Sequence, residues 1–483
     1  MSQCLISDLP PEIIVLIVQH LPGPEVKNLR LACRSLACMV RLRLRRIFIS
    51  SNPLDIEVFR AVADHEAYRH DMEELVWDDA RFPMTQFHEC HLSPCEDQNC
   101  LCAEQAAGNA ERAPKKYIQA FQLNENWLWR RVKGEAHLPH NVERARKLLA
   151  RVPVSTCWQY YHELVEQQKQ VIDENLDIEA LKYGLGRFPF FRRIIVTPAT
   201  HGYLFNPLYE TPMIRKFPYG FNYPIPRAWP ARVEGFHKTI PAWDDLIKRD
   251  YYRGFTNIIK LLAEDKCPQA KEFIMQTAQE PTGNNYAALR NPRLFNALSR
   301  ASDLESMHLC TDVDRDSSYE NMGRNNNESI KRFIPLQTIL HIKAWPKLKH
   351  FGLSRFLVIQ SDIVGFLKLL PTSIRTIELS FLFMTGEGSL WGFLQQIRDE
   401  LGWEQRHESE RPRVRISVDT GPYWNWELSI NVDREVHDYL YNKGANPFVE
   451  FEWERCGPVR PPAGMECDVL EPGHNRPATA ADG

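Results

Sequence analysis

The sequence predicts a mixed α+β or α/β fold, in which an N-terminal three-helix unit precedes a solenoid of strand-and-helix repeats. Two observations lead to this prediction. Within the first 50 residues, apolar side chains recur with the three-and-four spacing of amphipathic helices. Beyond residue 50, short apolar segments share the pattern apolar-x-x-apolar-x-apolar, and helix-like stretches separate them.

Composition narrows the class of protein. The 483 residues are 43% hydrophobic and 25% charged, with a net charge of -3, as in an ordinary globular protein. The chain lacks the excess of basic residues that is typical of nucleic-acid-binding proteins. No apolar run reaches the ~18 residues of a membrane span. The N-terminus also lacks the basic start of a signal peptide. We therefore expect a cytoplasmic or nuclear protein whose 12 cysteines are reduced thiols.

The first predicted helix lies in the segment SDLPPEIIVLIVQHLPG, residues 7–23. Ser7 or Asp8 can cap it, and its first turn tolerates Pro10 and Pro11. Its apolar side chains are Ile13, Leu16, Ile17 and Leu21 on one face, with Ile14 and Val18 beside them.

A second helix and a third short segment are expected to complete the unit. The second helix carries Val26, Leu29, Cys33, Leu36 and Val40, and the third segment carries Leu42, Leu44, Ile47 and Phe48. Three short helices bury few side chains among themselves, so such a unit is marginal alone and favours a partner surface.

These residues resemble an F-box. The matching positions, in order and spacing from about residue 5 to 49, are Leu9, Pro10, Glu12, Ile13, Ile17, Leu21, Val26, Leu29, Leu31, Cys33, Arg34 and Leu36. The resemblance implies that the three-helix unit docks on a Skp-family adaptor, which joins a cullin-based (SCF) ubiquitin ligase.

The resemblance also implies which side chains form the adaptor-binding surface or its support. They are Leu9, Pro10, Glu12, Ile13, Ile17, Leu21, Val26 and Leu29. The alternative is an N-terminal helical hairpin that packs on its own chain.

The later part of the chain resembles degenerate leucine-rich repeats. Six segments carry the strand-like pattern; they begin at Leu75, Arg193, Leu304, Leu348, Ile374 and Val414. Leu348 and Ile374 are 26 residues apart, which is a leucine-rich-repeat period, and a helical face of Ile363, Phe366, Leu367 and Leu370 lies between them. The alternative is a generic α/β domain whose strands read alike.

Further segments extend the resemblance over most of the chain. Residues 74–79, 201–230 and 345–354 resemble the long F-box proteins of filamentous fungi. The 201–230 segment is rich in aromatic residues and prolines, so we expect a long structured loop. Its aromatic side chains either form an interaction surface or fasten the loop to the core.

The predicted organisation is an F-box over residues 1–50, a leucine-rich-repeat-like substrate-binding domain over 51–455, and a disordered tail over 456–483. Loops are expected as insertions at about 84–115, 201–230 and 311–330.

We find no convincing catalytic motif, neither a phosphate-binding loop nor a nucleophile elbow, and we expect no cofactor. One cluster of thiols and imidazoles suits zinc; it comprises His88, Cys90, His91, Cys95, Cys100 and Cys102. Its spacing lacks paired CxxC geometry, so reduced loop cysteines without a special role are the alternative.

The sequence therefore predicts a non-catalytic substrate receptor of a ubiquitin ligase, with a Skp-family adaptor, a cullin bound through it, and an unidentified target protein as partners. We expect neither nucleic acid nor membrane as a partner. The alternative class is a non-ligase scaffold, in which the repeats serve another assembly. An enzyme is a distant third hypothesis.

Overall fold

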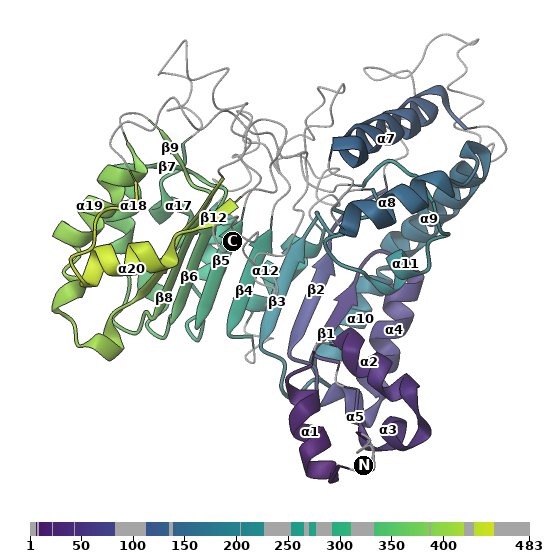
Figure 1. Ribbon diagram of the computed structural model, residues 1–483, viewed down its shortest axis with the longest axis horizontal. Helices are drawn as coiled ribbons and strands as arrows, with labels where there is room; N and C mark the ends of the chain where they lie inside the picture. Colours follow the sequence, from purple (N-terminus) through teal and green to yellow (C-terminus); the bar gives the residue numbers. More distant parts are fainter. Residues whose placement is uncertain are drawn as a thin grey trace, which may run out of the picture.

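The computed structural model describes residue 6 and residues 9–21, 23–42, 44–82, 113–134, 139–202, 204–226, 253–264, 270–276, 292–310, 333–385, 388–419 and 429–448. Its centre is one parallel sheet in the order β1-β2-β3-β4-β5-β6-β8-β10 (Figure 1). Its strands are β1 (Arg46–Ile49), β2 (Glu74–Asp78), β3 (Arg193–Thr197), β4 (Glu272–Gln276), β5 (Ser306–Cys310), β6 (His350–Ser354), β8 (Thr376–Ser380) and β10 (Arg413–Arg415).

Neighbouring strands in this sheet follow one another along the chain. Every pairing is parallel, from β1 with β2 to β8 with β10. Connections between parallel strands are almost always right-handed, so a sheet that grows in one direction carries its connections on one face.

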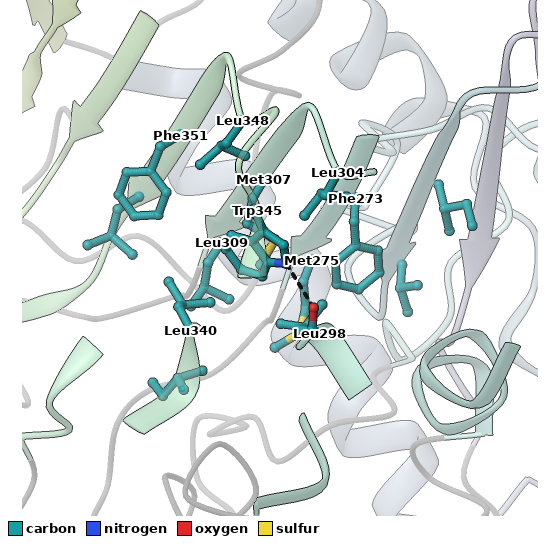
Figure 2. Packing of buried hydrophobic residues seen from close by; sticks show 14 of the residues in the cluster. Phe273, Met275, Leu298, Leu304, Met307, Leu309, Leu340, Trp345, Leu348 and Phe351 are labelled. Atoms are coloured by element: carbon teal, nitrogen blue, oxygen red, sulfur yellow. Dashed lines mark hydrogen bonds between the residues drawn. The ribbon is translucent and has the colours of Figure 1, made fainter. Parts of the chain in front are cut away.

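Two rows of apolar side chains cross the sheet and define this covered face. The first row is Leu75, Ile194, Phe273, Met307, Phe351, Ile377 and Val414; the second is Trp77, Val196, Met275, Leu309, Leu353 and Leu379. All of them are buried in one continuous core. Figure 2 shows part of this core, with Phe273, Met307 and Phe351 of the first row and Met275 and Leu309 of the second. The period of two along each strand sends these side chains to the same face.

Helices complete this core. They are α4 (Pro53–Asp64), α5 (Glu66–Arg69), α10 (Leu176–Leu185), α12 (Arg253–Ala263), α14 (Pro292–Leu298), α17 (Leu336–Ile339), α18 (Gln360–Leu367), α19 (Leu390–Glu400) and α20 (Asp433–Tyr441). Between β5 and β6, the indole N–H of Trp345 donates to the Leu298 carbonyl over 2.8 Å (Figure 2). This bond fastens the end of α14 beneath the strands.

A helical insertion forms a second core between β2 and β3. It consists of α7 (Lys115–Gly134), α8 (Pro139–Leu149) and α9 (Val154–Glu174), and α11 (Pro212–Arg215) lies in the aromatic segment after β3 (Figure 1). Phe221 and Tyr223 are buried among these helices, whereas Tyr209 is buried on the other face of the sheet. These three aromatic side chains fasten the segment to the protein, and Tyr219 is exposed.

Several short elements complete the described structure. The remaining strands form the pairs β7 (Leu357–Ile359) with β9 (Phe383–Thr385) and β11 (Ser417–Asp419) with β12 (Ser429–Asn431). The 3-10 turns are Ile342–Ala344, Trp403–Gln405 and Glu408–Glu410.

The six predicted strand-like segments are confirmed as members of the central sheet. Strand β4, Glu272–Gln276, was not predicted. The predicted helical face between Leu348 and Ile374 is also confirmed, because Ile363, Phe366 and Leu367 are buried on α18.

Two details of the N-terminal prediction are wrong. The third predicted helix does not form, because Arg46–Ile49 is strand β1, where Ile47 and Ile49 alternate with half-buried neighbours. The second predicted helix is interrupted at Cys33, whose backbone is extended at φ -159° and ψ 162°. The Cys33 thiol instead accepts the Leu36 N–H over 3.5 Å and so begins a separate helix.

Some predictions fall outside the described residues. These are the Cys/His cluster of His88 to Cys102, all but the last three residues of the loop at 84–115, the loop at 311–330 and the tail at 456–483. Within the described residues, no helix is long and apolar enough to cross a membrane.

Candidate adaptor-binding surface

Three short helices form the N-terminal unit: α1 (Pro11–Gln19), α2 (Gly23–Ala32) and α3 (Arg34–Met39). Pro10 is the N-cap residue of α1 and Pro11 is its first residue, where the missing N–H costs no helical hydrogen bond. Glu12 follows in the first turn, close to the positive end of the helix dipole. The local sequence thus fixes where α1 begins.

The interior of this unit is small. Its fully buried hydrophobic side chains are Ile14, Val26, Leu36 and Val40. Half-buried side chains surround them; these are Leu9, Val18, Leu21, Leu29, Met39 and Leu42. So small a core provides little stability on its own.

The outside of the unit is unusually apolar. Eleven large hydrophobic side chains are exposed among the described residues, and five of them lie here: Ile6, Ile13, Val15, Leu16 and Leu31. Leu31 is 75% exposed and Leu16 is 53% exposed. Such a concentration within one short segment is typical of a surface that binds another protein.

The eight predicted site residues occupy different places in this unit. Pro10, Glu12 and Ile13 are exposed, and Val26 is buried inside the unit. The other four are half-buried; they are Leu9, Leu21 and Leu29, which pack against the small core, and Ile17. The structure thus places most of the set at or next to the surface, with Val26 beneath it.

The predicted set omitted four exposed hydrophobic side chains, Ile6, Val15, Leu16 and Leu31. A signal for Val15 and Leu16 was available, because α1 is apolar around most of its circumference. One small core cannot bury every side of such a helix.

Contacts to the following elements hold the unit at the β1 edge of the sheet (Figure 1). The Arg41 guanidinium donates to the Ala67 carbonyl over 2.6 Å and to the Asp71 carboxylate over 2.9 Å. Arg45 lies 3.7 Å from the Glu73 carboxylate. The exposed aliphatic surface is therefore fastened to the large domain.

A buried group of polar side chains lies elsewhere, at the end of β2. The His201 ring lies 3.7 Å from the Asp78 carboxylate and 3.0 Å from the Tyr223 hydroxyl. Burial raises the pKa of Asp78 to about 7, although the Ala80 N–H opposes this shift. Each of the three side chains is buried, so the group is suited to fastening the aromatic segment rather than to binding a substrate.

Together these features define a protein with an apolar docking unit in front of a large parallel sheet. The family model for the F-box domain matches residues 6–48, which span α1 to α3 and reach into β1. The chain is therefore an F-box protein. F-box domains bind Skp-family adaptors within SCF complexes, and F-box proteins are typically non-catalytic substrate receptors. No curated protein matches the chain.

Proposed function

We propose that this chain is the substrate-recognition subunit of an SCF-type ubiquitin ligase in the cytoplasm or nucleus. Its F-box, residues 1–50, binds a Skp-family adaptor and, through it, a cullin, while the region 51–455 binds a target protein. The complex holds the target beside a conjugating enzyme that carries ubiquitin. This raises the local concentration of target lysines, so ubiquitin transfer becomes effectively intramolecular. The chain itself supplies no catalytic residue in this mechanism.

The observation that carries the proposal is the exposed aliphatic surface of the matched segment. In the proposed complex, Ile13 and its neighbours Leu9, Pro10 and Ile17 lie against the adaptor. Glu12, Leu21 and Leu29 border this contact, and Val26 supports it from the interior. We add Val15, Leu16 and Leu31 to the proposed surface because they are exposed and apolar.

We further propose that the large domain is a leucine-rich-repeat-like solenoid. Support comes from the strand order, which follows the chain, and from the two apolar rows that recur on every strand from β2 to β8. Spacing adds support: register partners Arg46 and Glu74 are 28 residues apart, and His350 and Thr376 are 26 apart. Both spacings fall within the leucine-rich-repeat period. The spacings between the other neighbouring strands are longer because they contain insertions.

The proposed target surface lies on the helical insertion. Four further exposed hydrophobic side chains belong to it or to the aromatic segment: Leu123, Val142, Leu149 and Tyr219. Val142 and Leu149 are seven residues apart on α8 and therefore share one face of the helix. The Tyr219 hydroxyl donates to Glu143 of the same helix over 3.2 Å, which places this aromatic ring beside α8. Exposed aromatic and aliphatic side chains gathered in this way suit a protein partner.

Binding of the purified full-length chain to a Skp-family adaptor tests the proposal. Ile13→Asp places a charge in the apolar contact, and we expect more than about 30-fold weaker binding, as for a hot-spot residue. Leu123→Asp is the matched control, because Leu123 is similarly exposed but lies on α7, and it should bind the adaptor like the wild type. Equal binding of both variants would refute the proposed surface.

Co-purification with a cullin then separates a ligase subunit from a non-ligase scaffold. A ligase subunit recovers the cullin together with the adaptor, and Ile13→Asp loses both. Recovery of the adaptor without any cullin from a mixture of all three proteins would favour the scaffold.

A further inference from the structure

Two histidines and a glutamate come together on the face of the sheet opposite the two apolar rows. His308 of β5 is the register partner of Gly352 of β6, which in turn is the partner of Glu378 of β8. His350 lies two residues before Gly352 and points to the same face. The three side chains therefore surround one glycine on three adjacent strands.

The geometry suits a shared ligand. One ligand atom from each of His308, His350 and Glu378 lies within 4.8 Å of the other two. The imidazole rings are stacked, with centroids 6.3 Å apart and an interplanar angle of 21°. Tetrahedral zinc needs neighbouring ligand atoms about 3.3 Å apart, which small side-chain rotations reach from this arrangement.

Gly352 provides the space for this cluster. A Cβ atom at this position would lie only 2.1 Å from Nδ1 of His308 and 2.6 Å from its Cγ. The ring of His308 therefore lies directly over the backbone of the neighbouring strand, and only glycine permits that approach. The same contact leaves Nδ1 over the middle strand β6, which carries His350 and lies between the strands of His308 and Glu378.

The hydrogen bonds leave ring nitrogens available. Nε2 of His308 lies 3.1 Å from the Ser354 hydroxyl, which fixes the orientation of the ring. Nδ1 of His308 and Nε2 of His350 are both buried and have no hydrogen-bond partner among the residues that the structure describes. A buried polar atom without a partner costs free energy, so two such atoms close to a carboxylate favour a bound cation.

The cluster also has a cationic neighbour. Arg415 is the neighbouring cation, at 3.6 Å from the Glu378 carboxylate. Its shorter contact, 3.1 Å, is with Asp433. Asp433 thus draws part of the arginine charge away from the glutamate.

We propose that His308, His350 and Glu378 bind a zinc ion that cross-links strands β5, β6 and β8. Two imidazole nitrogens and a carboxylate oxygen are a ligand set that zinc adopts in proteins, with a fourth position left for water or another donor. Ser354 serves as the outer partner that orients the His308 ligand. This site is separate from the proposed adaptor-binding and target-binding surfaces and does not depend on them.

Zinc titration of the full-length protein tests the proposal. The background carries Cys90→Ser, Cys95→Ser, Cys100→Ser and Cys102→Ser, so that the separate Cys/His cluster does not contribute. After chelation and dialysis, we expect one zinc ion per chain by calorimetry and elemental analysis. His350→Gln and Glu378→Gln should each weaken binding by more than about tenfold, since outer-shell changes alone cost 10–100-fold.

Two further variants make the result specific. Ser354→Ala should weaken zinc binding by about tenfold through loss of ligand orientation. His70→Gln changes an exposed histidine far from the cluster in the sheet and should leave the affinity unchanged. Cobalt in place of zinc should give visible d–d absorption that His350→Gln abolishes.

A folded background protein that binds no zinc, with folding verified by circular dichroism, would overturn the proposal. So would zinc binding of equal affinity in the background protein and in both ligand variants.

Discussion

The carboxylate of Asp79, at the end of β2, accepts the backbone N–H of Gly254, at the start of α12, over 2.8 Å. The same carboxylate accepts the Phe255 N–H over 3.2 Å. The two residues are 175 positions apart in the chain, and the contact caps a helix that covers the sheet. Loss of either partner should therefore loosen α12 from the strands.

Asp79→Ala should lower the free energy of unfolding by about 3 kcal/mol, because it removes a charged cap and leaves buried N–H groups unsatisfied. It also removes the partner of the buried Arg81, whose guanidinium lies 3.0 Å from Asp79. Urea denaturation measures the change. Asp303→Ala is the control, since Asp303 pairs with Lys347 at the surface, and a loss above about 1 kcal/mol is not expected there.

Gly254→Ala should destabilise the protein by about 1–3 kcal/mol through overpacking. Its new Cβ atom would lie 2.2 Å from the Trp77 indole, which is itself buried between the helix and the sheet. Gly365→Ala in α18 is the matched control, because a Cβ atom there meets nothing within 4 Å. That control should gain about 0.5–1 kcal/mol from helix propensity, and similar losses for both variants would contradict the packing argument.

Val26→Ala should cost about 2 kcal/mol in the three-helix unit, because Val26 belongs to its four-residue buried core. Ile13→Ala should cost less than about 0.5 kcal/mol, because Ile13 is 42% exposed. Hydrogen exchange of the α1–α3 amides measures both changes. Equal amide protection in Val26→Ala and Ile13→Ala would contradict the assignment of Val26 to the core and of Ile13 to the surface.

Asp78 and Asp55 should contribute a decline in stability as the pH rises from about 4 to about 7, and the buried His308 and His350, whose pKa values burial lowers to about 4, should oppose it below about pH 6.5. Burial raises the pKa of Asp78 to about 7 and that of Asp55 to about 6, against an ordinary aspartate value of 3.8. Between these values the folded protein holds protons that the unfolded chain has released, so increasing pH favours unfolding. The charged or titratable groups near Asp78 are Asp55, Arg81 and His201.

Melting temperatures measured at intervals from pH 4.5 to 7.5 test this dependence. Asp78→Asn removes the ionisation, keeps an acceptor for the Ala80 N–H and should flatten the decline. Asp303→Asn, at the surface, should retain the wild-type slope. An unchanged slope in Asp78→Asn would mean that another group is responsible.

The strands were the most predictable part of the fold. In the segment Ile374 to Leu379, for example, Ile377 and Leu379 are buried on strand β8, and Ile374 is buried just before that strand. The order of these strands along the chain is also their order in the sheet. Strand β1 was mistaken for a helix because its four residues are too few to distinguish the 3.6-residue period of a helix from the two-residue period of a strand. For the candidate surface, the motif matched Ile13 and Leu31, but side-chain exposure was needed to assign Leu31 to the surface and to add Val15 and Leu16.

By itself, the sequence determined the F-box and the run of apolar-x-x-apolar-x-apolar strands, because both depend on spacing within a few turns of helix or a few residues of strand. The tertiary structure alone decided which distant residues meet. Asp79 and Gly254 form a cap across 175 residues, and His308, His350 and Glu378 become neighbours only through strand register. Local patterns encode elements, whereas such contacts depend on which distant elements become neighbours and in which register they align.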